Sequence, residues 1–142
     1  MRQKIDFGID LGTTNSAIAC MQDGEALIVK SDDNQMDTTP SCVAFNKKQT
    51  IFVGLSAKNA IEREAISTYK SGKQNTDANG YQEFKRTMGT DFTYISSYMS
   101  RSYTSEELSA EVLKKLKGYV LEDVASAVIT GTLIVLFRLG IM

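Results

Sequence analysis

The sequence IDLGTTNS, residues 9–16, decides the fold of this chain. Apolar runs flank it on both sides and predict two strands joined by a turn built from Gly12, Thr13 and Thr14. Such a turn can direct consecutive backbone N–H groups and two hydroxyls into one small concavity, which suits a phosphate. Asp10 ends the first strand with a carboxylate, a ligand that Mg²⁺ accepts directly or through its waters. The turn is therefore a candidate phosphate-binding hairpin, but the same residue types are ordinary turn chemistry, and the turn alone does not decide between the two.

Composition and spacing exclude several other kinds of site. No Gly-x-x-x-x-Gly-Lys follows the turn, and a strand rather than a helix follows it, which excludes a Walker P-loop and a dinucleotide fingerprint. The chain has no histidine, which excludes imidazole metal ligands and triads with a histidine base. A net charge of −1 over 142 residues argues against a nucleic-acid interface.

The first half of the chain predicts an antiparallel meander. Asp23-Gly24 is a tight-turn signal, and Pro40, which lacks an N–H, is expected to begin a strand rather than interrupt one. The expected strands are residues 4–11, 15–22, 25–31, 41–46 and 50–54.

The next segments change from strand to helix periodicity. Residues 55–66 predict a helix with Ser56 as a weak cap, and residues 67–80 are polar enough to predict an exposed loop. A short helix is expected over residues 81–88 and one or two short strands over residues 92–103.

The clearest helix start is Thr104, because Glu107 three residues later completes a capping box. The helix presents an apolar stripe, with Lys114, Lys115 and Lys117 outside it on a solvated face. Residues 125–130 then form a continuous apolar run, typical of a buried strand. The chain is therefore an α/β protein with a mixed sheet and flanking helices.

The cysteines indicate an intracellular environment. Cys20 and Cys42 lie in predicted strands without zinc spacing, so we expect small buried thiols in a reducing cytosol. The charged N-terminus lacks the apolar segment of a secretory signal, and no run is long enough for an ordinary membrane span. We expect a cytoplasmic protein with no membrane partner.

Four segments in order resemble the ATPase domain of the seventy-kilodalton heat-shock chaperones, the DnaK family. The first is the hairpin at residues 9–16, which is also similar, more loosely, to sugar kinases and actin. The others are Thr-Thr-Pro-Ser at residues 38–41, Val-Gly followed by Ala-Lys-Asn at residues 53–59, and Phe-Lys-Arg at residues 84–86. Lys58, within the third segment, is expected only to decorate a helix surface.

This resemblance implies the actin-like ATPase fold, with its ribonuclease H-like motif, and the first lobe only. It implies ATP or ADP with Mg²⁺ as ligands, with Lys85 as the catalytic lysine that orients water and meets the γ-phosphate. Arg86 would support the site by charge, and Asp10 would hold the cation. The phosphates would be held by Gly12, Thr13, Thr14 and Asn15. From the residues alone, a solvated helix face is the favoured interpretation of Lys85 and Arg86.

The resemblance ends near Thr130, which predicts a partial nucleotide-binding domain over residues 1–130. Residues 131–142 are mostly aliphatic with one charge, Arg138, and we interpret them as an atypical apolar tail, out-of-frame or added to the natural chain. An extra strand or helix covering the core is the alternative. The second lobe's contributions to the site would follow residue 130.

The sequence thus predicts a fragment of an ATP-dependent protein-folding chaperone that does not hydrolyse ATP by itself. In the full-length parent, the resemblance implies unfolded polypeptide clients, a J-domain co-chaperone and a nucleotide-exchange factor. Two alternatives stay open: a fragment of a sugar- or acid-kinase-like phosphotransferase, and a non-enzymatic module that self-associates.

Overall fold

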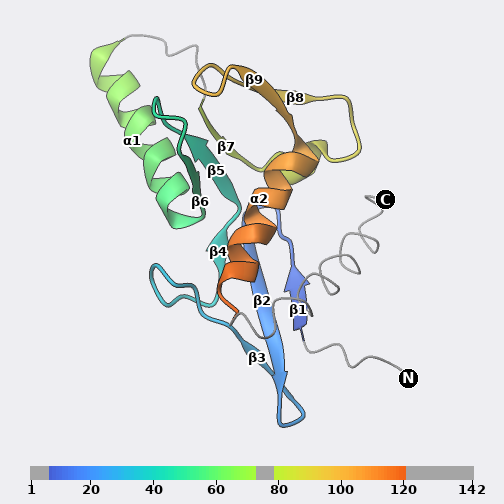
Figure 1. Cartoon of the computed structure of the whole chain (residues 1–142). Helices are drawn as coiled ribbons and strands as arrows, with labels where there is room; N and C mark the ends of the chain where they lie inside the picture. Colours follow the sequence, from blue (N-terminus) through green and yellow to red (C-terminus); the bar gives the residue numbers. More distant parts are fainter. Residues whose placement is uncertain (1–6, 73–78, 121–142) are drawn as a thin grey trace.

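The computed structural model describes residues 7–72 and 79–120, which form nine strands, two α-helices and one 3₁₀ helix (Figure 1). In chain order these are β1 (Phe7–Asp10), β2 (Asn15–Gln22), β3 (Glu25–Ile28), β4 (Thr39–Pro40), β5 (Cys42–Phe45), β6 (Ile51–Val53), α1 (Leu55–Ser71), β7 (Gly80–Gln82), η1 (Phe84–Thr87), β8 (Thr93–Ser96), β9 (Arg101–Thr104) and α2 (Ser105–Gly118).

Two small antiparallel sheets carry the fold, and a separate hairpin joins β8 to β9. The first sheet has the order β1-β2-β3, with β4 also pairing with β2, and the second has the order β6-β5-β7. In the first sheet Ile9 lies opposite Ile18, and both side chains are buried because alternate residues of a strand share one face. The predicted hairpin and meander are confirmed.

The chain passes from the first sheet to the second at Ser41. Pro40 lies opposite Asn15 in the short strand β4, and β5 begins two residues later at Cys42. Pro40 therefore ends a strand rather than beginning one, and that prediction was wrong. The lone residue between the strands, Ser41, is 2% exposed and lies where the two sheets meet.

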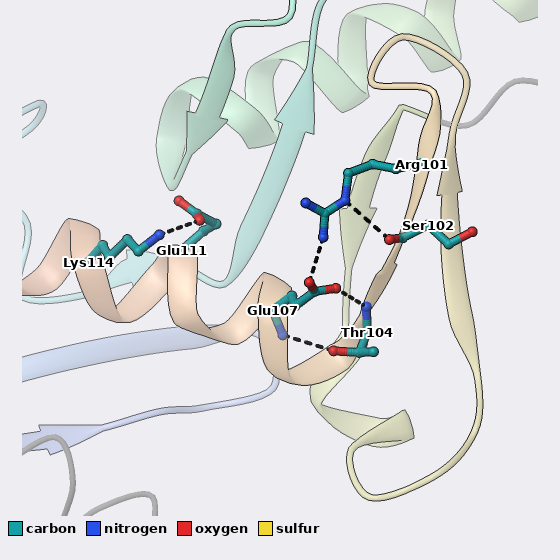
Figure 2. Close-up of polar contacts among 6 residues, drawn as sticks. All are labelled: Arg101, Ser102, Thr104, Glu107, Glu111 and Lys114. Atoms are coloured by element: carbon teal, nitrogen blue, oxygen red, sulfur yellow. Dashed lines mark hydrogen bonds and ion pairs between the residues drawn. The ribbon is translucent and has the colours of Figure 1, made fainter.

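Helix α2 begins with the predicted capping box (Figure 2). The Glu107 N–H donates to Thr104 Oγ1 at 3.2 Å, and the Thr104 N–H donates to Glu107 Oε2 at 2.9 Å. Arg101 reaches the same carboxylate from β9, with Nη2 2.5 Å from Oε1. These contacts fix the first turn of the helix against the end of the β8–β9 hairpin.

One apolar cluster joins α2 to both sheets. In Figure 1 the helix crosses between the β1–β2 pair and β5. Phe45 stacks on Tyr103 with ring centroids 4.7 Å apart. The buried members are Phe7, Ile9, Leu11, Ile18, Val43, Phe45, Tyr81, Phe84, Tyr103, Leu108, Val112, Leu113 and Leu116.

The lysines of α2 differ in exposure and in the residues they pair with. Lys114 is exposed and pairs with Glu111 at 2.7 Å, as a solvated face predicts. Lys115 is only 27% exposed, and its Nζ lies 3.0 Å from Asp32 Oδ1. It therefore ties the end of α2 to the loop before β4.

Helix α1 is longer than predicted and begins differently. It continues to Ser71 and ends at Gly72 in the left-handed conformation, so residues 67–71 are helix and not loop. Gly54, not Ser56, is the N-cap residue, and the Ser56 hydroxyl donates to the Val53 carbonyl. Residues 67–71 contain no glycine or proline that would stop the helix, and their polar side chains face solvent.

The predicted helix over residues 81–88 is also only partly right. Tyr81 lies opposite Val43 in the second sheet, because the backbone of β7 completes that sheet beside β5. Glu83 then takes a positive φ of 56°, and only Phe84–Thr87 form a 3₁₀ turn. Met88, in an extended conformation, is the C-cap of this turn, and Gly89 follows it with φ of 77°.

Two predictions lie outside the described residues: the buried strand at 125–130 and the apolar tail at 131–142. Within residues 7–72 and 79–120, no helix has the length and hydropathy needed to cross a membrane. Cys20 and Cys42 are both free, the first half-buried and the second buried.

Candidate functional site

The tip of the β1–β2 hairpin is too tightly closed for any residue but glycine at position 12. A Cβ built on Gly12 would lie 1.9 Å from the carbonyl oxygen of Asn15, far inside any real contact. The backbone therefore folds back on itself between Gly12 and Asn15. This places Thr13 and Thr14 at the outer end of the turn.

Two buried serines, Ser16 and Ser41, make hydrogen bonds to the backbone of the tip. The Gly12 N–H donates to Ser16 Oγ at 3.2 Å, and Ser41 Oγ donates to the Gly12 carbonyl at 2.8 Å. The Ser41 N–H donates to the Thr14 carbonyl, also at 2.8 Å. The carbonyl groups of Gly12 and Thr14 thus both accept hydrogen bonds from Ser41.

The amides of the two threonines are left without acceptors. Among the residues that the structure describes, neither the Thr13 nor the Thr14 N–H donates to a protein atom. Thr13 is half-buried and Thr14 is exposed. Adjacent free N–H groups at an accessible turn make a nest that favours an anion.

Lys85 binds the residue just before this tip, Leu11, although the two are 74 positions apart in sequence. Its Nζ donates to the carbonyl oxygen of Leu11 at 2.5 Å, and the side chain is half-buried. Phe84, buried in the core, anchors η1, and its carbonyl accepts a hydrogen bond from Ser105 Oγ. An ammonium group has three donors, so two remain after the bond to Leu11.

Arg86 and Asp10 are less closely associated with the hairpin tip than Lys85 is. Arg86 is exposed, and its Nη1 pairs with Glu83 Oε2 at 3.3 Å rather than with the tip. Asp10 is exposed at the end of β1 and lies opposite Ala17. No group of three or more acidic, cysteine or histidine side chains gathers in residues 7–72 and 79–120, so Asp10 offers a single carboxylate.

A small cleft of about 120 Å³ opens beside the tip. Lys58, which is exposed on the surface of α1 as expected, also lines this cleft. The cleft is lined by Thr13, Thr14, Asn15, Pro40, Ser41, Cys42, Lys58, Gln82 and Glu83. The signal that could have found Lys58 is its place one turn into the helix that follows Val53-Gly54, close to the sheet that supports the tip.

Cys42 contributes a buried, free thiol to the lining of this cleft. Burial raises the pKa of its thiol, an effect that exceeds the opposite influence of the Lys58 charge. The thiolate is the reactive form, so a raised pKa keeps the sulfur inert near neutral pH. The polar side chains that line the cleft carry three kinds of group: hydroxyls, amides and charges. They are those of Thr13, Thr14, Ser41, Asn15, Gln82, Lys58 and Glu83.

This arrangement defines a class of protein: an α/β fold whose opening hairpin presents free amides at its tip and is bound at Leu11 by a lysine from a later segment. Residues 6–135 match the family model described as Hsp70 protein, and the chain belongs to this family. Over 127 residues it is 41% identical to the chaperone protein DnaK of Thermosipho africanus, covering 87% of this chain. The chain spans only 19% of that relative. The family predicted from the four sequence segments is confirmed, and it implies the actin-like ATPase fold.

Proposed function

We propose that this chain is the first lobe of an Hsp70 nucleotide-binding domain, including its ribonuclease H-like motif, and that it holds the phosphates of ATP or ADP. The observation that carries the proposal is the pair of amides, Thr13 and Thr14, that have no acceptor among the described residues, in a tip that Lys85 Nζ binds at the Leu11 carbonyl. Backbone amides, hydroxyls and an ammonium group are the donors that phosphate oxygens require. Family membership supports the same ligand class.

Each site residue has a distinct part in this proposal. Gly12 allows the close turn, and the amides and hydroxyls of Thr13, Thr14 and Asn15 bind the β- and γ-phosphates. Lys85 meets the γ-phosphate and orients the attacking water, and Arg86 adds positive charge at longer range. Phosphoryl transfer depends mainly on such positioning and charge stabilisation.

Asp10 fits Mg²⁺ only in part. One exposed carboxylate suits the cation if waters and phosphate oxygens complete its shell, which is the usual arrangement for Mg²⁺ at nucleotides. When bound, the cation would neutralise charge on the phosphates. Asp10 would orient it by accepting hydrogen bonds from its waters.

We propose that the chain alone does not hydrolyse ATP. It spans 19% of its DnaK relative, and the tip and cleft form one side of a site. A half-site neither excludes water nor holds both ends of a nucleotide. In the full-length protein, we infer a cytoplasmic chaperone that couples ATP to the binding of unfolded clients and works with J-domain and nucleotide-exchange partners.

The two alternative functions have less support than the chaperone proposal. The family match is to chaperones, which disfavours a sugar- or acid-kinase-like phosphotransferase. The alternative of a self-associating module rests on the predicted strand at residues 125–130 and the tail, both of which lie outside the described residues.

Two assays test the proposal: nucleotide binding tests the phosphate site, and phosphate release tests whether the chain alone hydrolyses ATP. Equilibrium dialysis with ATP and Mg²⁺ is expected to detect weak binding that Lys85→Ala reduces, while Lys114→Ala, an exposed lysine paired with Glu111, leaves it unchanged. Release of radioactive γ-phosphate at high protein concentration should stay at background. Turnover that Lys85→Ala abolishes would show that the half-site is competent, and no ATP binding at all would refute the phosphate site.

A further inference from the structure

We propose that Ser16 and Ser41 close a ring of hydrogen bonds on Gly12 and thereby position the Thr13 amide for a phosphate oxygen. The inference rests on the proposed function, because it assigns positioning residues to the same site. Ser41 belongs to the Thr-Thr-Pro-Ser segment, for which the proposed function supplies no role. Neither serine touches the ligand in this proposal.

Each serine hydroxyl has a single proton, and this fixes the direction of every hydrogen bond in the ring. Ser41 Oγ lies 2.8 Å from the Gly12 carbonyl, which can only accept, so the single Ser41 hydroxyl proton is used there. Ser16 and Ser41 Oγ atoms are 2.8 Å apart, so Ser16 must donate to Ser41. The Gly12 N–H donates in turn to Ser16 Oγ at 3.2 Å.

The ring therefore begins at the N–H of Gly12 and ends at its C=O. Each hydroxyl accepts one bond and donates the next, an arrangement in which the bonds polarise one another. Ser16 is 1% exposed and Ser41 is 2% exposed, so bulk water does not compete for these groups. Removing either hydroxyl breaks the ring and leaves a buried partner unsatisfied.

The ring controls the direction of the free amide because the peptide bond is planar and trans. The Gly12 C=O and the Thr13 N–H belong to the same peptide and point in opposite directions. Since Ser41 binds this carbonyl from the protein side, the Thr13 N–H points away from Ser41. Ser41 also binds the Thr14 carbonyl through its own N–H, which turns the Asn15 N–H away in the same manner.

Ser41 links the tip to the second sheet. It stands between β4, which pairs with β2, and β5, the central strand of the second sheet. The tip is thus held by a residue 29 positions away rather than by its own turn alone. A donor held by a rigid element loses less entropy when it binds a ligand.

The test compares Ser41→Ala and Ser16→Ala with Ser96→Ala in the full 142-residue chain. Ser96 is a matched control: it is 1% exposed, and its hydroxyl also makes two hydrogen bonds, to Asn79 Oδ1 and from the Met99 N–H. Inorganic phosphate is titrated into each ¹⁵N-labelled protein, and backbone order parameters are measured without phosphate. We expect Ser41→Ala and Ser16→Ala to weaken phosphate binding about tenfold, because misplaced donors lose much of their effect.

The order parameters of Thr13 and Thr14 should fall in both ring variants and stay unchanged in Ser96→Ala. Because the two serines act in one ring, the double variant should lose little more affinity than either single variant. The inference is overturned if Ser41→Ala binds phosphate like the wild type, or if Ser96→Ala weakens binding equally. A wild type that binds no phosphate would refute the proposed function instead, and unchanged tip order parameters in the ring variants would still overturn the ring.

Discussion

The closest contact at the site gives the most specific mutational prediction, Gly12→Ala. The added Cβ would lie 1.9 Å from the Asn15 carbonyl oxygen, so the tip must open by more than 1 Å to reach an ordinary contact. Crowding of this kind costs about 1–3 kcal/mol. Opening also strains the bonds from Gly12 to Ser16 and Ser41, each of which contributes about 1 kcal/mol. Because these losses overlap, we expect about 3 kcal/mol of lost stability.

Urea unfolding followed by circular dichroism measures this loss, with Gly8→Ala as the matched control. Gly8 lies in β1, the strand that leads into the tip, and a Cβ there meets no atom within 4 Å, so its substitution should change stability by no more than about 0.5 kcal/mol. Gly12→Ala should also lose phosphate binding under conditions where it remains folded. The reasoning is refuted if Gly12→Ala is as stable as Gly8→Ala and binds phosphate normally.

Three further predictions concern the supporting structure. Thr104→Ala removes one half of the capping box and should cost about 1 kcal/mol in urea unfolding; a change below a third of that would contradict the cap. The Gly89 N–H bound to Glu106 lowers the pKa of that carboxyl from its usual 4.5, so its contribution is present above pH 4.5 and lost as pH falls through the lower native value. The stability advantage of wild type over Glu106→Gln should therefore shrink on acidification, and an advantage that grows there would be inconsistent. Lys58→Gln should weaken ATP binding about threefold by removing a charge from the cleft, whereas Lys70→Gln at the far end of α1 should not; equal effects in dialysis would argue against the cleft.

The local signals in the sequence predicted most of what depends on neighbouring residues. The hairpin, the Asp23-Gly24 turn and the capping box at Thr104 were all correct, because each is determined within a few positions. The end of α1 was wrong because polar residues 67–71 looked like a loop, whereas a helix can expose them all until Gly72. Polarity alone does not distinguish an exposed helix from a loop.

What the sequence could not predict depends on contacts between distant segments. Tyr81 became part of a strand because β5 offered an open edge, which no local pattern reveals. A role for Lys85 at the hairpin was implied only by a family resemblance, and its contact with Leu11 was not predicted. Nor was the contribution of Lys58 to the cleft that Thr13 also lines. The ring through Ser41 joins residues 29 positions apart, and their spacing carries no signal.

The central claim is that the unpaired amides of the hairpin tip bind phosphate groups. The most direct measurement is a ¹H–¹⁵N spectrum of the labelled chain titrated with ATP and Mg²⁺. We predict that the Thr13 and Thr14 amide resonances shift together along one saturable curve, and that Lys85→Ala reduces these shifts. If the two resonances stay in place at saturating nucleotide, or if shifts occur only at sites far from the tip, the account is contradicted.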